Sequence, residues 1–194
     1  EECLASGVLT ATADAVAFRH ELARRAVEIS LPPTRRIALH RAALAALSDA
    51  THRPHDPARL AHHAEGAGDA AAVLRFAPEA AAIAARLGSH REASAQYARA
   101  LRFSQELPDE QRAELLTLRS AECRVTGEYA DAIETREAAI AVYRSMDDRL
   151  REGDGQRALS AIMCCFGLIE DAAQAGQRAL DLLEPVADGP ELAF

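Results

Sequence analysis

Three segments of the sequence repeat a short pattern around a glycine, and this repeat constrains the fold more than any other feature. The segments begin at Gly88, Gly127 and Gly167, so the glycines are 39 and 40 residues apart. In each segment an acidic residue and an alanine follow the glycine, and a second alanine with an aliphatic neighbour comes seven residues later. A period of this length indicates a helical solenoid, in which each pair of helices buries its apolar face by stacking on the next pair.

The residue types in this repeat suit a tight turn between two packed helices. Glycine adopts the left-handed backbone conformation that ends many helices, and an acidic residue in the first turn of the next helix interacts favourably with the helix dipole. Two alanines seven residues apart lie on one face of that helix and let two backbones approach closely. We therefore expect leucine at Ala132 or Ala172 to overpack this interface by about 1–3 kcal/mol.

The first 18 residues carry a different pattern. Small and β-branched side chains alternate there, which predicts a β-hairpin with strands over Val8–Thr12 and Ala15–Phe18. From Glu21 onward apolar residues recur at helical spacing, interrupted by glycine and proline, so the chain is predicted to be all-α, with one hairpin followed by about ten helices. Pro78 lies inside one predicted helix and should kink or break it at Ala77.

The composition excludes several chemistries. The sequence contains no Lys, no Asn and no Trp, so all 22 basic residues are arginines. A phosphate-binding loop of the GxxxxGK[ST] type and a Schiff-base lysine both require lysine. The chain also has no GxSxG nucleophile motif, and its carboxylates are scattered at salt-bridge spacings along helix faces. We therefore predict that this chain is not an enzyme.

Charge and hydropathy bear on partners and location. The formal net charge of −8 argues against direct binding of nucleic acid. No apolar run approaches the roughly 20 residues that cross a bilayer, and the first residues lack the basic and apolar order of a signal peptide. We expect no membrane partner and a soluble, cytoplasmic protein.

The histidines suggest no metal site. His62 and His63 are neighbours on a predicted helix, so their rings should point about 100° apart and cannot both bind one metal ion from that helix. The loop His52–Asp56 contains ligand types, but nothing near it in the sequence completes a four-ligand site. We predict no metal ligands in the chain.

The cysteines likewise suggest no disulfide or metal framework. Their spacing matches neither a CxxC motif nor a secreted-domain pattern, and the adjacent pair lies in an apolar run, where cysteine behaves as a small hydrophobic residue. The four positions are Cys3, Cys123, Cys164 and Cys165.

The repeat resembles the tetratricopeptide repeat over residues 70–185, on its turn glycine, its acidic residue with alanine, an aromatic at Tyr97 and the later alanine with its aliphatic neighbour. This resemblance implies a right-handed superhelix of helix pairs, an α-α solenoid, over residues 51–194. In such arrays the first helix of each pair lines a concave groove. Counting back from the glycines places six polar residues in the groove, where a partner protein or small-molecule inducer would bind: Arg75, Glu114, Thr117, Arg124, Asp154 and Arg157.

The first third of the chain carries a second resemblance. The segments Phe18–Arg24, Leu31–Arg36, Leu39–His40 and Leu60–Ala64 occur in this order in LuxR-type bacterial transcriptional regulators of the STAND ATPase class. Those proteins carry an ATP-binding module, a winged helix, a helical repeat arm and a DNA-binding helix-turn-helix. The resemblance implies that residues 1–50 are the end of the winged-helix module, with the hairpin as its wing, followed by two helices. Six basic residues there would contact nucleotide or the ATPase module, or would instead be helix surface paired with Glu21 and Glu28: Arg19, His20, Arg24, Arg35, Arg36 and His40.

These features together predict a regulatory or sensor arm of a LuxR-like, ATP-dependent transcriptional regulator. The chain itself would hold no cofactor, because ATP would bind to a domain outside it. Two other functions fit the same sequence. One is a free-standing tetratricopeptide scaffold, in which the apolar side of the hairpin would be covered, and the other is the regulatory arm of a multidomain kinase or cyclase. An exposed apolar edge of the solenoid would favour a homodimer.

Overall fold

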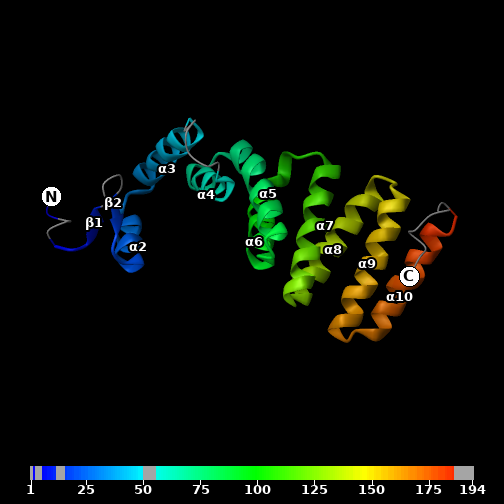
Figure 1. Ribbon diagram of the computed structural model, residues 1–194. Coiled ribbons are helices and arrows are strands. Elements are labelled where there is room, and N and C mark those ends of the chain that lie inside the picture. The colour runs from blue at the N-terminus through cyan, green and yellow to red at the C-terminus, as the bar shows by residue number, and fades with distance from the viewer. Residues whose placement is uncertain (1, 3–5, 12–15, 50–55, 186–194) are drawn as a thin grey trace.

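The computed structural model describes residues 2, 6–11, 16–49 and 56–185, and in this part of the chain nine α-helices follow a two-stranded hairpin (Figure 1). The fold class predicted from the sequence, an all-α helical solenoid with a short hairpin, is confirmed. No helix among the described residues is long and apolar enough to cross a membrane. The elements are β1 (Leu9–Ala11), β2 (Val16–Phe18), α2 (Glu21–Ser30), α3 (Pro33–Ser48), α4 (Pro57–Ala67), α5 (Ala70–Arg86), α6 (His90–Leu101), the 3-10 helix η1 (Ser104–Glu106), α7 (Asp109–Thr126), α8 (Tyr129–Ser145), α9 (Arg149–Phe166) and α10 (Ile169–Leu183).

The helices from α4 to α10 form one row, here called the arm, in which each helix packs against the helices next to it in sequence. The hairpin and α2 lie at one end of this row and α10 at the other (Figure 1). Because the contacts join sequence neighbours, the arm has the nearly one-dimensional construction of a repeat protein. The repeat spacing therefore predicted the correct architecture.

The turn glycines have the backbone conformation predicted for them. Gly88, Gly127 and Gly167 have φ angles of 74°, 79° and 89°, in the left-handed region that side chains rarely adopt. Gly68, between α4 and α5, shares this conformation with a φ of 70°. After α8 the same position is taken by Asp147, with a φ of 57°. The glycine turn thus recurs once more than the aligned repeat indicated.

The alanines seven residues apart lie in the interfaces between the arm helices. All six are buried: Ala93 and Ala100 in α6, Ala132 and Ala139 in α8, and Ala172 and Ala179 in α10. Larger residues fill the spaces between them, including Phe76 and Tyr97 in the first part of the arm and Ile140, Leu159 and Ile162 in the last. Burial of small residues at these positions is what brings the backbones together.

Two local expectations need correction. The break expected at Ala77 is absent: α5 continues through Pro78, because the residues on both sides of the ring pack against the neighbouring helices, including the fully buried Ala77 and Ala81. Packing of the whole helix outweighs the one backbone hydrogen bond that proline removes. Cys164 and Cys165 are exposed at the end of α9 rather than packed in an apolar core.

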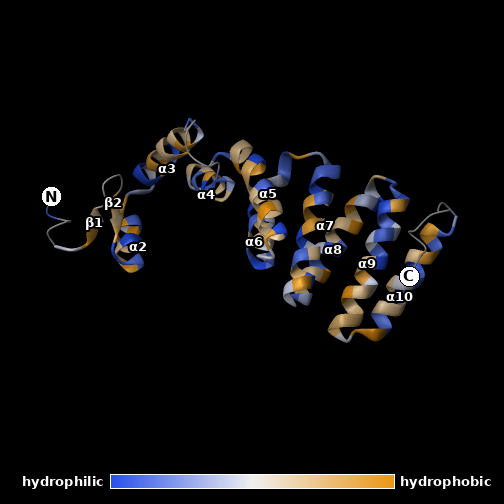
Figure 2. Cartoon of the chain, in the orientation of Figure 1, coloured by the Kyte–Doolittle hydropathy of each residue, from blue (hydrophilic) through white to orange (hydrophobic). Residues whose placement is uncertain are grey.

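The hairpin was predicted correctly; β1 begins at Leu9 rather than at Val8, and Thr12 and Ala15 lie outside the described residues. β1 and β2 pair antiparallel, with Leu9 opposite Phe18 and Ala11 opposite Val16. Neither α2 nor α3 contains a buried residue, although both carry hydrophobic residues (Figure 2). Leu22 is 80% exposed and Ile29 is 74% exposed. The N-terminal region, defined here as β1, β2, α2 and α3, thus has regular secondary structure with little core.

Candidate functional site

The groove residues predicted from the sequence divide into two sets. Arg75 lies on α5, with its guanidinium 4.9 Å from the centre of the neighbouring Phe76 ring. Glu114 lies on α7, where its charge acts on the buried Tyr97; burial raises the pKa of this tyrosine most, and the charges of Glu122 and Glu114 add to the effect. Glu114 lies one helical turn before Thr117 on α7, and the other four predicted residues are linked to one buried arginine.

Thr117, Arg124, Asp154 and Arg157 come together around an arginine that the sequence analysis missed, Arg136 of α8. The Nη2 atom of Arg136 donates to the Thr117 carbonyl oxygen at 3.2 Å, and its Nε atom donates to Ser120 Oγ at 3.3 Å. The residue is only 6% exposed.

The charges of this group act on one another. Burial lowers the pKa of the Arg136 guanidinium, the Asp154 carboxylate opposes this effect, and the positive charges of Arg157 and Arg124 reinforce it. We call Arg124, Arg136 and Arg157 the arginine cluster. Its residues come from three successive helices, α7, α8 and α9.

Among the charged groups that act on Arg136, Asp154 supplies the carboxylate, and that carboxylate is already engaged. Arg157 donates to Asp154 Oδ1 from Nε at 3.0 Å and from Nη2 at 2.6 Å. Arg124 is exposed. Within the described part of the chain, Arg136 makes its hydrogen bonds to neutral oxygens and forms no ion pair. A positive site with more guanidinium groups than carboxylates is suited to bind an anion, and arginine can do so with two parallel hydrogen bonds.

Arg136 was missed because the sequence analysis counted positions only on the first helix of each pair. Arg136 lies on the second helix, nine residues after Gly127. An arginine that falls between the buried residues Thr135 and Ala139 was a signal in the sequence, because a long charged side chain on a buried face needs a polar environment.

The basic residues of the N-terminal region do not form one patch. Arg24 lies between two acidic residues of its own helix, with Nη2 at 2.6 Å from Glu21 Oε1 and Nη1 at 2.7 Å from Glu28 Oε2. Its two hydrogen-bonded carboxylates raise the pKa of Arg24, and the partner arginine lowers the pKa of Glu21. Arg24 is therefore part of a local network on the surface of α2.

Two other residues of this set line a cleft. Arg36 and His40 of α3 face Arg25 and Glu28 of α2 across a cleft of about 330 Å³, which α4 closes with His62, Glu65 and Gly66. The remaining three lie elsewhere: Arg19 and His20 are exposed between β2 and α2, and Arg35 is exposed on α3.

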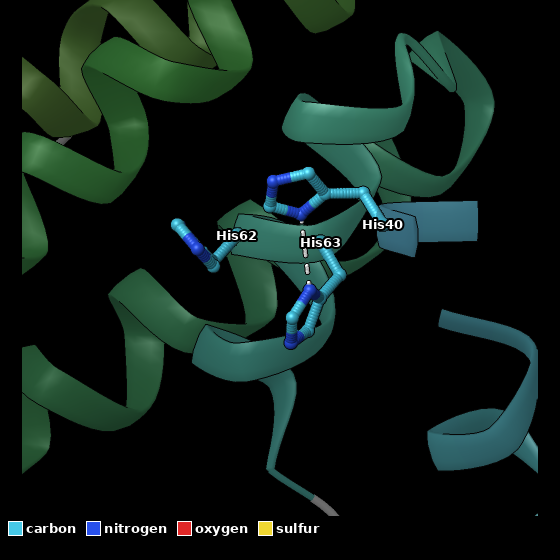
Figure 3. Close-up of side chains that lie close together, drawn as sticks. All are labelled: His40, His62 and His63. Carbon is cyan, nitrogen blue, oxygen red and sulfur yellow. Dashed lines mark hydrogen bonds between the residues drawn. The ribbon is translucent and has the colours of Figure 1, made fainter. Parts of the chain in front are cut away.

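The prediction about His62 and His63 was wrong in its geometry. The ring centres of these neighbours are 5.2 Å apart, and His40 from α3 lies 5.4 Å and 5.3 Å from them (Figure 3). Backbone directions about 100° apart do not keep two imidazoles apart when rotation about their side-chain bonds turns both toward a third ring. The loop at His52–Asp56 lies outside the described residues except for Asp56, whose Oδ1 atom accepts a hydrogen bond from the Arg59 amide at the start of α4.

No protein-family model and no curated protein matches the sequence. Among solved structures, the chain is similar to BtubC (BKLC) from P. vanneervenii, with 18% sequence identity and a TM-score of 0.48. The matched region covers 81% of this chain and 59% of that one, so the chain spans less than two thirds of its length.

Proposed function

We propose that this chain is the non-enzymatic regulatory arm of a LuxR-like, ATP-dependent transcriptional regulator, and that its arginine cluster binds an anionic group of a partner protein or inducer. ATP and DNA would bind to other domains of the protein. Rearranged packing along the arm would relay the binding event, because each helix contacts its sequence neighbours.

The arginine cluster is the observation that carries the binding part of this proposal. A buried guanidinium costs free energy unless a carboxylate or another anion compensates it. Arg136 is hydrogen-bonded to neutral oxygens, and its neighbours Arg124 and Arg157 add positive charge rather than removing it. An anion at this place would satisfy the unmatched charge and would contact three successive helices at once.

The N-terminal region supports the regulator over a free-standing scaffold. A scaffold would cover the apolar side of its hairpin and first helices. Instead Val16 of β2 is exposed, as are Leu22 and Ile29 of α2. Exposed apolar side chains on adjacent elements are typical of surfaces that pack against another part of a protein. The tetratricopeptide-like repeat and the LuxR-like order of motifs are the sequence basis for naming that part as the winged-helix and ATPase modules.

The binding proposal is tested by a thermal-shift screen of anionic small molecules and acidic peptides. We expect a bound anion to raise the unfolding midpoint of the protein and the shift to disappear in the Arg124→Ala/Arg157→Ala double variant. Arg178→Ala removes an exposed arginine of α10 and serves as the control, which should keep the shift. If no anion stabilises the protein, or if the double variant keeps the shift, the arginine cluster is not the binding site.

The identity of the parent protein is tested by its genomic reading frame. We expect a GxxxxGK[ST] motif upstream of this sequence and a helix-turn-helix downstream. A reading frame with neither would contradict the regulator, and a kinase or cyclase domain in the same frame would establish the alternative parent.

A further inference from the structure

His40, His62 and His63 bring three imidazoles from two helices to one place. Each can offer one ring nitrogen such that the three nitrogens lie within 4.8 Å of one another. The closest pair, His40 Nδ1 and His63 Nδ1, is joined by a hydrogen bond of 3.1 Å (Figure 3), whose proton a bound metal ion would replace. We call these residues the histidine cluster.

The spacing is close to that of a metal site. Zinc binds imidazole nitrogen at about 2.0–2.1 Å with tetrahedral geometry, which places two ligand nitrogens about 3.3 Å apart. His40 Nδ1 and His63 Nδ1 therefore already have nearly the separation of two zinc ligands. His62 is exposed, so a rotation of its side chain can bring the third nitrogen to bonding distance.

A glycine in α4 keeps His40 in this position. A Cβ atom at Gly66 would lie 2.5 Å from both Cγ and Nδ1 of the His40 ring, far inside contact distance. Glycine inside a helix is less favourable than alanine. The helix thus carries a destabilising residue at a position where a side chain would displace His40, whose side chain is only 12% exposed.

The groups next to the histidine cluster also suit a metal site. Glu28 Oε1 lies 4.0 Å from His40 Nε2, where a carboxylate can orient an imidazole that binds metal through its other nitrogen. The adjoining cleft between α2, α3 and α4 leaves room for a fourth ligand such as water.

The geometry points to a binding site for a divalent transition-metal ion of the zinc class, held by His40, His62 and His63. Three neutral imidazoles with an open fourth position suit zinc better than magnesium or calcium, which prefer oxygen ligands. The ion would join α3 to α4, and so would attach the N-terminal region to the arm. The proposal of this metal site does not rest on the arginine cluster or on the identity of the parent protein.

The experiment is a calorimetric titration with zinc chloride of the whole chain, produced without a histidine tag and freed of metal by a chelator. We expect one ion per chain, and an affinity at least about tenfold lower in His62→Gln and in His63→Gln, because loss of a ligand costs more than loss of a residue that only orients one. His90→Gln is the matched control. It lies on α6 with its own partner, Glu122, 2.7 Å away, and it should bind zinc as the unaltered protein does.

Two further variants make the outcome decisive. Gly66→Ala keeps all three ligands but displaces His40, so zinc affinity should fall while circular dichroism shows the helices retained. His52→Gln/His55→Gln should leave zinc binding unchanged. Three results would each overturn the proposal. They are an absence of zinc binding by the unaltered protein, an unchanged zinc affinity in the His62→Gln and His63→Gln variants, and a loss of zinc binding in the His52→Gln/His55→Gln variant alone. X-ray absorption of the zinc-loaded protein should count three imidazoles, and one or two would also overturn it.

Discussion

The N-terminal region and the arm are both helical, yet they differ in what holds their helices. In the arm every helix buries residues against its neighbours, and the alanine positions of α6, α8 and α10 are almost completely covered. In the N-terminal region α2 and α3 bury none. α3 touches the arm through the partly buried Leu44 and Leu47 and through His40. A helix-forming sequence is therefore sufficient to define these helices, while their stability depends on a partner surface.

The largest expected effect is the difference in the free energy of unfolding lost when isoleucine is replaced by alanine in the arm and in the N-terminal region. Ile162 of α9 is 2% exposed and packs between Cys123 and Ala132, whereas Ile29 of α2 is mostly exposed. Ile162→Ala should lower the free energy of unfolding by about 2–5 kcal/mol through lost burial and a cavity, and Ile29→Ala should change it by less than about 0.5 kcal/mol. Urea titration monitored by circular dichroism measures both. Equal losses would mean that α2 is packed in solution against a surface that this structure lacks.

The second comparison concerns substitutions that enlarge a side chain, from alanine to leucine, in the arm and in the N-terminal region. Ala132 of α8 is fully buried, and Ala42 of α3 is exposed. Ala132→Leu should destabilise the protein by about 1–3 kcal/mol because neighbouring backbones must move apart. Ala42→Leu should have almost no effect, since both residues form helices well. The same urea titration tests this pair, and a tolerated leucine at position 132 would contradict the close approach of α8 to α7 and α9.

The architecture could be predicted from the sequence because it follows from local pattern. The glycines at 88, 127 and 167 end helices by a property of glycine itself, and the paired alanines identify the buried face without knowledge of the partner. Pro78 shows the limit of this reasoning. Its local cost is real, but the packing of the rest of α5 decides the outcome, and packing is not visible in a short window of sequence.

The candidate sites could be predicted only in part, because each depends on residues far apart in sequence. Four of the six groove residues do gather, but the residue at their centre, Arg136, comes from the other helix of the pair. The histidine cluster needs His40, which lies more than twenty residues before His62. Nothing in the sequence near His62 indicates that α3 delivers a third imidazole there, and the helical glycine at position 66 acquires its meaning only from that contact.

The third comparison concerns ion pairs. Glu65 of α4 accepts from Arg99 Nε of α6 at 2.9 Å and also pairs with Arg102, so it joins two helices of the arm. Glu21 pairs within its own helix. Glu65→Gln should cost about 1 kcal/mol at neutral pH. Glu21→Gln should not measurably change the unfolding midpoint, because exposed pairs within one helix contribute little.

The effect of Glu65 should depend on pH with a definite sign. Burial alone would raise its pKa, but the hydrogen bonds from Arg102 and Arg99 outweigh burial and lower the pKa below its usual value of 4.5. A carboxyl group with a lowered pKa stabilises the folded state above the unfolded pKa, and this stability is lost as the pH falls through the folded value. Unfolding curves of the unaltered protein and Glu65→Gln, recorded with a chelator present, should therefore differ at pH 7 and converge in acid, as the pH falls through the lowered folded pKa. A difference that persists in acid would assign the effect to shape rather than charge.

The smallest expected effect tests whether the N-terminal region unfolds on its own. α4, α5 and α9 begin with aspartates whose side chains accept a backbone N–H bond, as Asp69 does from the Ala72 amide at 3.0 Å. α2 begins after His20 with no such bond. His20→Asp would supply the missing acceptor and place a negative charge at the positive end of the helix dipole, which stabilises a helix by about 0.3–1 kcal/mol.

The expected result is confined to α2, because α2 buries nothing against the arm. The gain should slow the hydrogen exchange of α2 amides by up to about fivefold, by the free-energy relation for local opening. The unfolding midpoint of the arm should stay unchanged. If the midpoint of the arm rose together with the protection of α2, the two regions would unfold as one cooperative unit, and the contacts of α3 through Leu44, Leu47 and His40 would be strong enough to couple them.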